Sequence, residues 1–181
     1  MKRVIILFII ALLAGCSSKE REAKNPVSAF DSVDPSTRSQ IAGLLNDYFT
    51  LNQSLILDSL AGAKLAASKF SETAKNFNVE KLTPEQLDFY LVHSSDLKTS
   101  LAQLDKSNNI EEARVELAVI SEAMYAMVKA FHPNDTPLYY QYCPMARDNK
   151  GANWLSATNE VVNPYMGQMM PSCGRTQETI E

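Results

Sequence analysis

Residues 83–131 read TPEQLDFYLVHSSDLKTSLAQLDKSNNIEEARVELAVISEAMYAMVKAF and contain the clearest helix signals of the chain. Thr83 is followed three positions later by Gln86, which is the capping box that opens a helix, and Asn109 with Glu112 repeats the device. After each start, apolar residues recur at steps of three and four, the spacing of one buried helix face. Two helices with so short a connection pack as antiparallel neighbours. The two apolar faces are Leu87, Tyr90, Ser94, Leu97, Leu101 and Leu104, then Ala113, Leu117, Ile120, Met124, Met127 and Phe131.

The same periodicity occurs twice upstream of this stretch. Asp34 can cap a helix whose opening turn holds Pro35 and which ends near Leu57. A second helix follows from Asp58 or Ser59. The sequence therefore predicts four helices. The apolar faces of the first two are Ile41, Leu44, Leu45, Tyr48, Leu51 and Leu55, then Leu60, Ala63, Ala67, Phe70, Ala74 and Phe77.

The chain changes character after the fourth predicted helix, which stops at His132-Pro133 because proline disfavours helical geometry in the residue before it. Proline and glycine are frequent beyond this point and exclude a fifth long helix. We expect a short extended piece at Leu138–Tyr142 and one helical turn after Asn163-Pro164. The predicted fold class is all-α, an up-and-down four-helix bundle (residues 35–132) with an irregular C-terminal cap (residues 133–181).

The first residues have the layout of a secretory leader. Lys2 and Arg3 precede an apolar run, Val4–Leu13, which is too short for a membrane span. The run ends in Leu13-Ala14-Gly15-Cys16, the pattern of a lipoprotein signal peptide. We expect residues 1–15 to be removed and Cys16 to carry the lipid, which would tether the protein to a membrane of the cell envelope, on the periplasmic or outer-membrane side. The alternatives are an uncleaved anchor and an ordinary secreted protein.

The charge and composition of the mature chain limit the kinds of partner that we expect. Residues 16–34 mix charged residues with Ser, Asn and Pro and are expected to be a flexible tether. Residues 35–181 suit one helical domain. Removal of the leader takes away two of 17 cations and none of 21 anions, so the net charge becomes −6. This excess of anions argues against a nucleic-acid partner.

Sulfur gathers in the cap. Pro144 favours an extended conformation at Cys143, so Cys143 and Met145 can face the same way. A second group contains Met166, Met169, Met170 and Cys173. Thiolate and thioether are soft ligands that select Cu(I) or Ag(I) over hard cations, while zinc is less favoured because methionine adds little to it.

A disulfide is the alternative for the same two cysteines. Cysteines in an oxidising envelope often pair, and a bond between Cys143 and Cys173 would stabilise the fold by about 3 to 4 kcal/mol in the chain-entropy model. Methionine is also a common core residue, and we assign Met124 and Met127 to packing. His93 lies beside the apolar face of the third helix, as a structural residue or as a nitrogen ligand.

The sequence contains no glycine-rich phosphate loop, no nucleophile elbow and no His-Glu-x-x-His pair. A thiol enzyme that uses Cys143 would need a base beside it, and the sequence places none there. We therefore expect a protein that is not an enzyme.

Several motifs carry a resemblance to a known family. They are Tyr140-Gln141-Tyr142-Cys143-Pro144-Met145-Ala146, Gly151-Ala152-Asn153-Trp154-Leu155-Ser156, Asn163-Pro164-Tyr165 with Gly167, Met170 with Cys173-Gly174, and Glu112-Ala113-Arg114. With these, residues 36–181 resemble small periplasmic domains of unknown function. Such domains occur as lone lipoproteins and at the C-terminal end of CusB-type copper and silver efflux adaptor subunits.

The resemblance implies a helical bundle with a C-terminal cap and a part in heavy-metal handling. It points to Cys143, Met145, Met170 and Cys173 as metal ligands, with His93 as a further one, whereas Met166 and Met169 stand where the family has other residue types. We therefore expect an envelope lipoprotein that binds Cu(I) or Ag(I) as a chaperone, buffer or efflux accessory. A metal efflux adaptor or another envelope protein would be its partner. The alternative is a disulfide-stapled protein-interaction module that presents Trp154 and the tyrosines and binds no metal.

Overall fold

Each helix of the bundle begins at a side chain that caps it. The computed structural model describes residues 29–181, so the predicted leader, Cys16 and most of the tether lie outside the described residues. Asp34, Ser59, Thr83 and Asn109 each accept a hydrogen bond from a backbone amide of the first turn, and Thr83 forms the predicted capping box with Gln86. All four helix starts are confirmed. The helices are α1 (Pro35–Ile56), α2 (Leu60–Lys75), α3 (Pro84–Asp105) and α4 (Ile110–Phe131).

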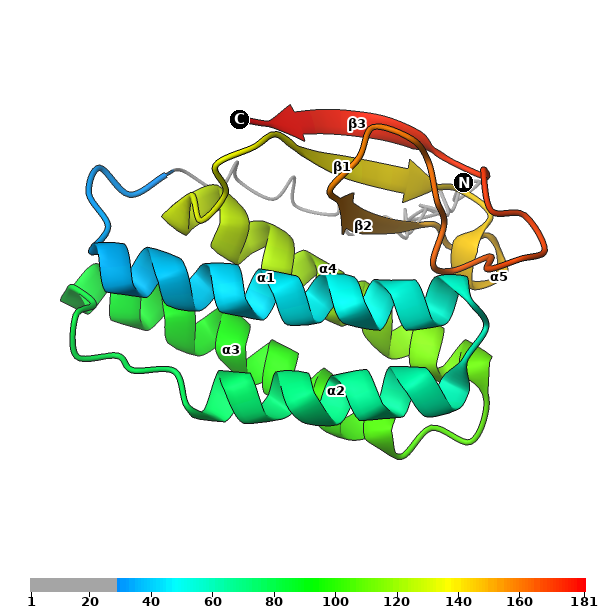
Figure 1. The fold of residues 1–181 in the computed structure, drawn as a ribbon, viewed down its shortest axis with the longest axis horizontal. Helices are drawn as coiled ribbons and strands as arrows, with labels where there is room; N and C mark the ends of the chain where they lie inside the picture. The colour runs from blue at the N-terminus through cyan, green and yellow to red at the C-terminus, as the bar shows by residue number, and fades with distance from the viewer. Residues whose placement is uncertain (1–28) are drawn as a thin grey trace, which may run out of the picture.

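The four helices pack as an up-and-down bundle. Consecutive helices are neighbours, and α4 returns to lie against α1 (Figure 1). The predicted apolar faces form one core, in which Tyr48, Phe70, Tyr90 and Phe131 are completely or almost completely buried. Met124 and Met127 are also fully buried in this core, which confirms their assignment to packing. No helix within residues 29–181 has both the length and the apolar composition needed to cross a bilayer.

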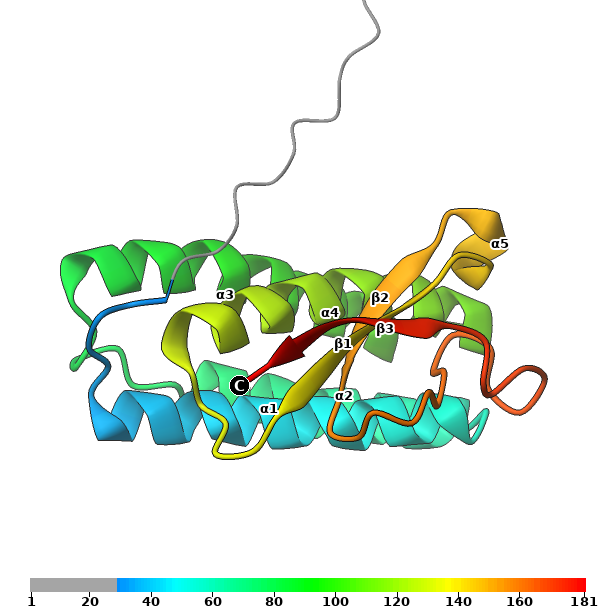
Figure 2. The same cartoon turned by 90° about the horizontal axis from the view of Figure 1, so that it is seen from above.

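The cap contains a small antiparallel sheet with strand order β2-β1-β3. The extended piece predicted near Leu138 is confirmed as β1, and the turn after Asn163 is confirmed by a hydrogen bond from Gly167 N to Asn163 O of 3.1 Å. The sequence prediction of an irregular cap missed β2 and β3. The sheet lies across α4, as the view from above shows (Figure 2). Its elements are β1 (Leu138–Cys143), α5 (Ala146–Asn149), β2 (Ala152–Ser156) and β3 (Arg175–Ile180).

The register of β1 and β2 assigns residues to the two faces of the sheet. Tyr140 pairs with Leu155, and the Tyr140 hydroxyl donates to Glu122 of α4, so this face meets the bundle. Gln141 pairs with Trp154 and therefore lies on the opposite face, because side chains alternate along a strand. Residues 157–174 cover that second face: the Gln141 side-chain amide donates to the backbone carbonyls of residues 158, 159 and 160.

One buried arginine connects the cap to the bundle. Arg114 of α4 is only 5% exposed and donates from Nε to Pro164 O at 3.0 Å. The same guanidinium donates to Leu55 O at the end of α1 and forms an ion pair with Asp58. A second connection is made by Tyr48 of α1, whose hydroxyl accepts from the backbone amide of β2 at Leu155. The cap is therefore docked at fixed points.

Candidate functional site

Two cysteines that are 30 positions apart in the sequence meet in the cap. The Sγ atoms of Cys143 and Cys173 lie 2.7 Å apart, and both are free thiols. Cys143 is the last residue of β1 and is completely buried, whereas Cys173 precedes β3 and is half-buried. Cys143 is three positions after Tyr140 and therefore lies on the opposite face of the sheet, where Cys173 reaches it from the covering segment 157–174.

Asn163 holds the segment that carries Cys173. Its side-chain amide donates to Cys173 O at 2.6 Å, and its Oδ1 accepts from the backbone amides of Tyr165 and Met166. The Asn163 backbone amide donates to Pro171 O at 2.8 Å. Asn163 is predicted from the sequence as the start of a turn and as part of the Asn163-Pro164-Tyr165 motif, and not as a residue that positions Cys173. Its position directly before Pro164 and Tyr165 was the available signal for its positioning role.

The environment of the pair makes Cys173 a weak acid. The hydrogen bond with Cys143 is the largest cause, followed by burial and by the charge of Cys143, and together they raise the pKa of Cys173 to about 11. The thiol form of Cys173 therefore dominates at neutral pH. A metal ion would have to displace this proton, and binding would release it to solvent.

The methionines of the cap divide between the sulfur pair and the surface. Met170 is half-buried, and its carbonyl accepts from Cys173 N at 3.1 Å, so both residues belong to one tight turn. Met145, two residues beyond Cys143, is 46% exposed. Met166 packs against the core, and Met169 is 79% exposed. Met170 is thus the methionine that shares a backbone turn with Cys173.

His93 lies apart from the two cysteines. It lies on α3, where its ring packs against Phe89 at a centroid distance of 4.4 Å. It also lines a cavity between α3, α4 and the sheet, and the lining includes none of the sulfur-bearing residues discussed above. Tyr140, which lines the same cavity, lies on the opposite sheet face from Cys143. The structure therefore brings the two cysteines together and does not bring His93 to them.

The arrangement can perform two kinds of chemistry. The adjacent thiols can lose two protons and share a soft cation, or they can be oxidised to a disulfide. Within residues 29–181, no three His, Cys, Asp or Glu side chains converge in a way that could hold a metal ion. A metal site here would consist of the two thiolates with thioether support from Met170 or Met145.

The comparisons with known proteins identify the bundle. A family model described as "Protein of unknown function (DUF3347)" matches residues 44–136, slightly more than half of the chain. The match covers most of α1 and all of α2, α3 and α4, and it ends before β1. No curated protein and no solved structure matches the chain. The chain therefore belongs to the family described as Protein of unknown function (DUF3347).

Proposed function

We propose that this protein is an envelope lipoprotein that binds a soft monovalent metal ion, Cu(I) or Ag(I), as a chaperone, a buffer or an accessory of an efflux system. The proposal rests on one observation, the 2.7 Å separation of the Cys143 and Cys173 sulfurs across 30 positions of sequence. Two thiolates at one point are a soft donor set that hard cations do not favour. The resemblance of the cap motifs to domains attached to copper and silver efflux adaptors supports the same choice of metal.

Binding would require the sulfurs to separate. Metal–thiolate bonds of about 2.3 Å place two sulfurs roughly 4 Å or more apart when they flank one ion. Cys143 is fixed in β1, whereas Cys173 lies in the turn that leads to β3, so Cys173 is the residue that would move. Met170 in the same turn would move with it, and its thioether would add a third soft ligand.

The proposed lipid anchor is tested separately from metal binding. Cys16 would be acylated after cleavage of residues 1–15, and the tether would carry the domain on the non-cytoplasmic side of a membrane. Incorporation of labelled palmitate into the wild-type chain, and its loss in Cys16→Ser, are the expected results. A wild-type chain that enters the soluble fraction without label would contradict the anchor.

Metal binding is tested by an anaerobic titration of Cu(I) against a chromophoric competitor. We expect one ion per chain with the reduced protein, and loss of competition in both Cys143→Ser and Cys173→Ser. Met170→Leu should weaken binding, whereas Met169→Leu serves as the matched control, because its thioether lies in the same segment but points to solvent. Equal Cu(I) affinity of the wild type and the two serine variants would refute the proposal.

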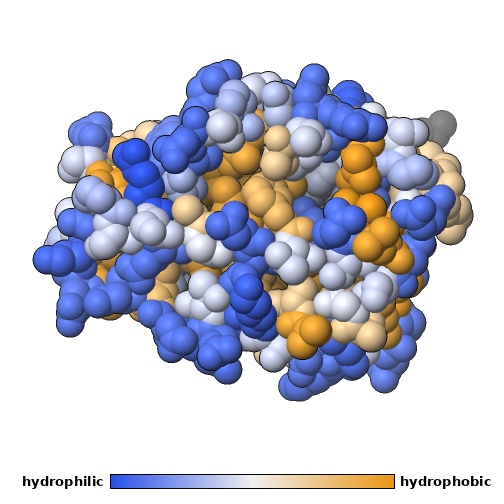
Figure 3. Space-filling view, in the orientation of Figure 1, coloured by the Kyte–Doolittle hydropathy of each residue, from blue (hydrophilic) through white to orange (hydrophobic). Residues whose placement is uncertain are grey.

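A second function is favoured by the same distance. Two thiols at 2.7 Å need only a small movement to reach the disulfide bond length of about 2.05 Å. The resulting staple would fix the cap for contact with an envelope protein. The prediction that this module presents Trp154 is wrong, because Trp154 is buried at 1% exposure. The exposed Met169 of the cap and Leu57 at the end of α1 would contribute to such a contact instead. Hydrophobic residues emerge among hydrophilic ones on the face formed by α1, α2 and the cap (Figure 3). Protein isolated without free thiols and without affinity for Cu(I) would support this function over metal binding.

A further inference from the structure

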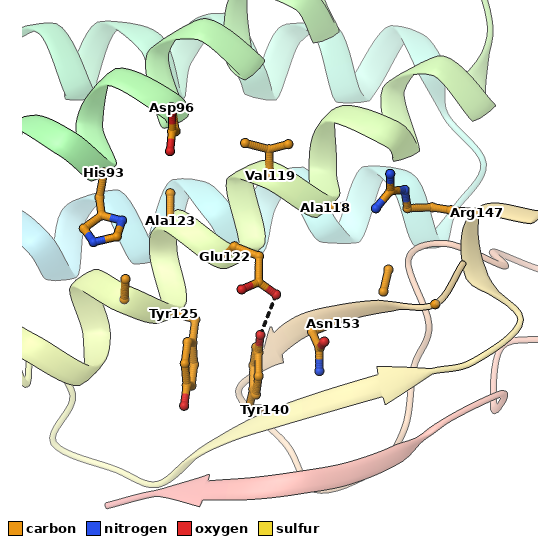
Figure 4. A pocket seen from close by; sticks show the side chains of 13 residues that line it. His93, Asp96, Ala118, Val119, Glu122, Ala123, Tyr125, Tyr140, Arg147 and Asn153 are labelled. Carbon is orange, nitrogen blue, oxygen red and sulfur yellow. Dashed lines mark hydrogen bonds between the residues drawn. The ribbon is translucent and has the colours of Figure 1, made fainter. Parts of the chain in front are cut away.

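A large cavity lies between α3, α4 and the bundle-facing side of the sheet. Its volume is about 960 Å³, near the upper end of the range of pockets that hold small organic molecules. The floor is recessed because α4 presents small side chains there, Ala118, Ala123 and Ala126. Polar groups also line the cavity: His93 and Asp96 of α3 lie at one end, Arg147 of α5 reaches in from the other, and Glu122 of α4 lies between them (Figure 4).

Arg147 is the most informative of these groups. It is half-buried, its Nε atom is fully buried, and its side chain makes no hydrogen bond or ion pair within residues 29–181. A buried N–H group is normally hydrogen-bonded, because the loss of its water must be compensated, and the Nε of Arg147 is an exception to this rule. A planar guanidinium with free donors binds carboxylate or phosphate oxygens by two parallel hydrogen bonds. Arg147 therefore supplies a ready position for an anion inside the cavity.

The backbone that carries Arg147 is unusual in a way that fixes this position. Arg147, Asp148 and Asn149 all have left-handed φ values, 56°, 56° and 63°, although none of them is glycine. Gly151 follows at φ 75°, where a Cβ atom would collide with the ring of Tyr142. Strained residues of this kind persist when the surrounding structure imposes them, and they gather at binding sites. Here the left-handed run turns the chain between β1 and β2 so that Arg147 faces the cavity rather than solvent.

The charged and aromatic side chains on the other walls of the cavity indicate which further groups a ligand would carry. Asp96 brings negative charge to the end of the cavity opposite Arg147, and Glu122 brings negative charge to its middle (Figure 4). The Glu122 carboxylate accepts from the Tyr140 hydroxyl at 2.8 Å, and the Tyr140 ring stacks on Tyr125 at a centroid distance of 3.9 Å. A ligand with an anion at one end alone would be repelled by these carboxylates, whereas one that also carries an ammonium group would be attracted at both ends.

We propose that this cavity binds a small zwitterionic molecule of the peptide type, with its carboxylate on Arg147 and its ammonium group near Asp96 and Glu122. The volume exceeds that of a single amino acid and suits a peptide of two or three residues. Alanine and tyrosine side chains provide the apolar surface for the peptide's own side chains. The site is separate from the sulfur pair and does not depend on the proposed metal function.

The test uses the full chain in detergent and isothermal titration with free tripeptides of sequence Ala-Xaa-Ala, in which Xaa is small, aliphatic, aromatic, acidic or basic. At least one of them should bind. Its N-acetylated form and its C-amidated form should each bind at least about tenfold more weakly, since each loses one charged contact. Asp96→Asn should weaken binding of the free peptide more than binding of the N-acetylated peptide.

The variant Arg147→Asn removes the cation while keeping a residue that tolerates left-handed geometry. We expect it to weaken binding about tenfold or more, with Trp154 fluorescence unchanged as evidence that the cap is folded. Arg175→Asn is the matched control, because Arg175 of β3 stacks on Tyr142 and does not line the cavity. The proposal is overturned if Arg147→Asn binds like Arg175→Asn, if the blocked and free peptides bind equally, or if no free tripeptide binds at up to about 5 mM.

Discussion

At the scale of single residues, the chemistry of the cap is controlled by what surrounds Cys173. Its nearest titratable neighbour is the buried Cys143 thiol, and that neighbour is the largest cause of the raised pKa of Cys173. The carbonyl of Cys173 is held by Asn163, which is itself completely buried. Cys143 therefore controls the pKa of the Cys173 thiol, and Asn163 controls the position of the Cys173 backbone.

The raised pKa of Cys173 predicts slow alkylation at ordinary pH. The thiolate is the reactive form, so the rate with iodoacetamide should reach its half-maximal value near pH 11, the value to which the pKa of Cys173 is raised. Cys143→Ala removes the largest cause and should shift this midpoint down toward the usual range of about 8.5. A midpoint in the reduced wild-type protein already at the ordinary value would contradict the prediction.

The same shift has a consequence for stability with a definite sign. Because the pKa of Cys173 is higher in the folded state, the unfolded chain loses this proton first as the pH rises. The contribution to the free energy of unfolding is fully present below the ordinary thiol pKa and is lost as the pH rises through about 11. Urea unfolding of the reduced protein across this window, with Cys173→Ser as the control, checks the slope.

Asn163→Ala should destabilise the protein by about 2 to 4 kcal/mol, because it leaves buried backbone groups without partners. The groups concerned are the carbonyl of Cys173 and the amides of Tyr165 and Met166. Urea unfolding would measure the change. Asn159→Ala is the matched control, since Asn159 is exposed and should cost no more than about 0.5 kcal/mol. Similar effects of the two variants would show that Asn163 does not organise the cap.

At the scale of elements, α4 contacts both the other helices of the bundle and the sheet of the cap. Its inner face fills the bundle core, and a further face supports the sheet through Tyr125 and Lys129, both of which bond Glu178 of β3. Arg114, near its start, reaches the end of α1 and the turn at Pro164. The helix thus joins the two layers of the molecule.

Arg114→Ala should separate the cap from the bundle without unfolding the helices. It removes the donors to Leu55 O and Pro164 O and the cation paired with Asp58, which keeps its hydrogen bond from the Gln168 amide. We expect the free energy of unfolding to fall by about 2 to 3 kcal/mol, mainly because buried carbonyls lose a charged donor. Trp154 is almost completely buried in the cap, so its fluorescence should shift to longer wavelength while helical circular dichroism remains. Arg38→Ala on the exposed surface of α1 is the control and should leave both signals unchanged.

At the scale of the whole molecule, the sulfur pair controls how the last quarter of the chain is closed. A bond between Cys143 and Cys173 would close a loop of 30 residues that contains α5, β2 and the segment covering the sheet. The chain-entropy model gives about 3 to 4 kcal/mol for such a loop. Metal binding and oxidation use the same electron pairs of sulfur, so the two states exclude each other.

We therefore expect the oxidised protein to unfold at a higher urea concentration than the reduced protein and to compete for no Cu(I). Reduction should restore Cu(I) binding. The double variant with serine at positions 143 and 173 should match the reduced apoprotein in stability and remain unaffected by oxidant. An oxidised protein, verified by thiol counting to hold no free thiol, that still binds Cu(I) stoichiometrically would place the metal elsewhere in the molecule.

The bundle was predictable because its signals are local. Thr83 with Gln86, and Asn109 with Glu112, mark helix starts within four residues. The recurrence of apolar residues at steps of three or four is visible within the sequence of a single helix. β3 was not predictable on these terms. Its sequence, RTQETI, is polar, and it becomes a strand because β1 offers a free edge when the cap folds back.

In the candidate sites, too, some features were predictable from the sequence and others were not. Residue types in the sequence identified Cys143 and Cys173 as the thiols of the cap, and Pro144 predicted the extended chain at Cys143 that β1 confirms. The contact between these two thiols, the position of His93 on the other side of the sheet and the entry of Arg147 into a cavity, where no residue of 29–181 pairs with it, depend on the tertiary structure. Chemical character and helical periodicity are properties of neighbouring residues, whereas these contacts depend on how distant segments pack, which no short stretch of sequence specifies.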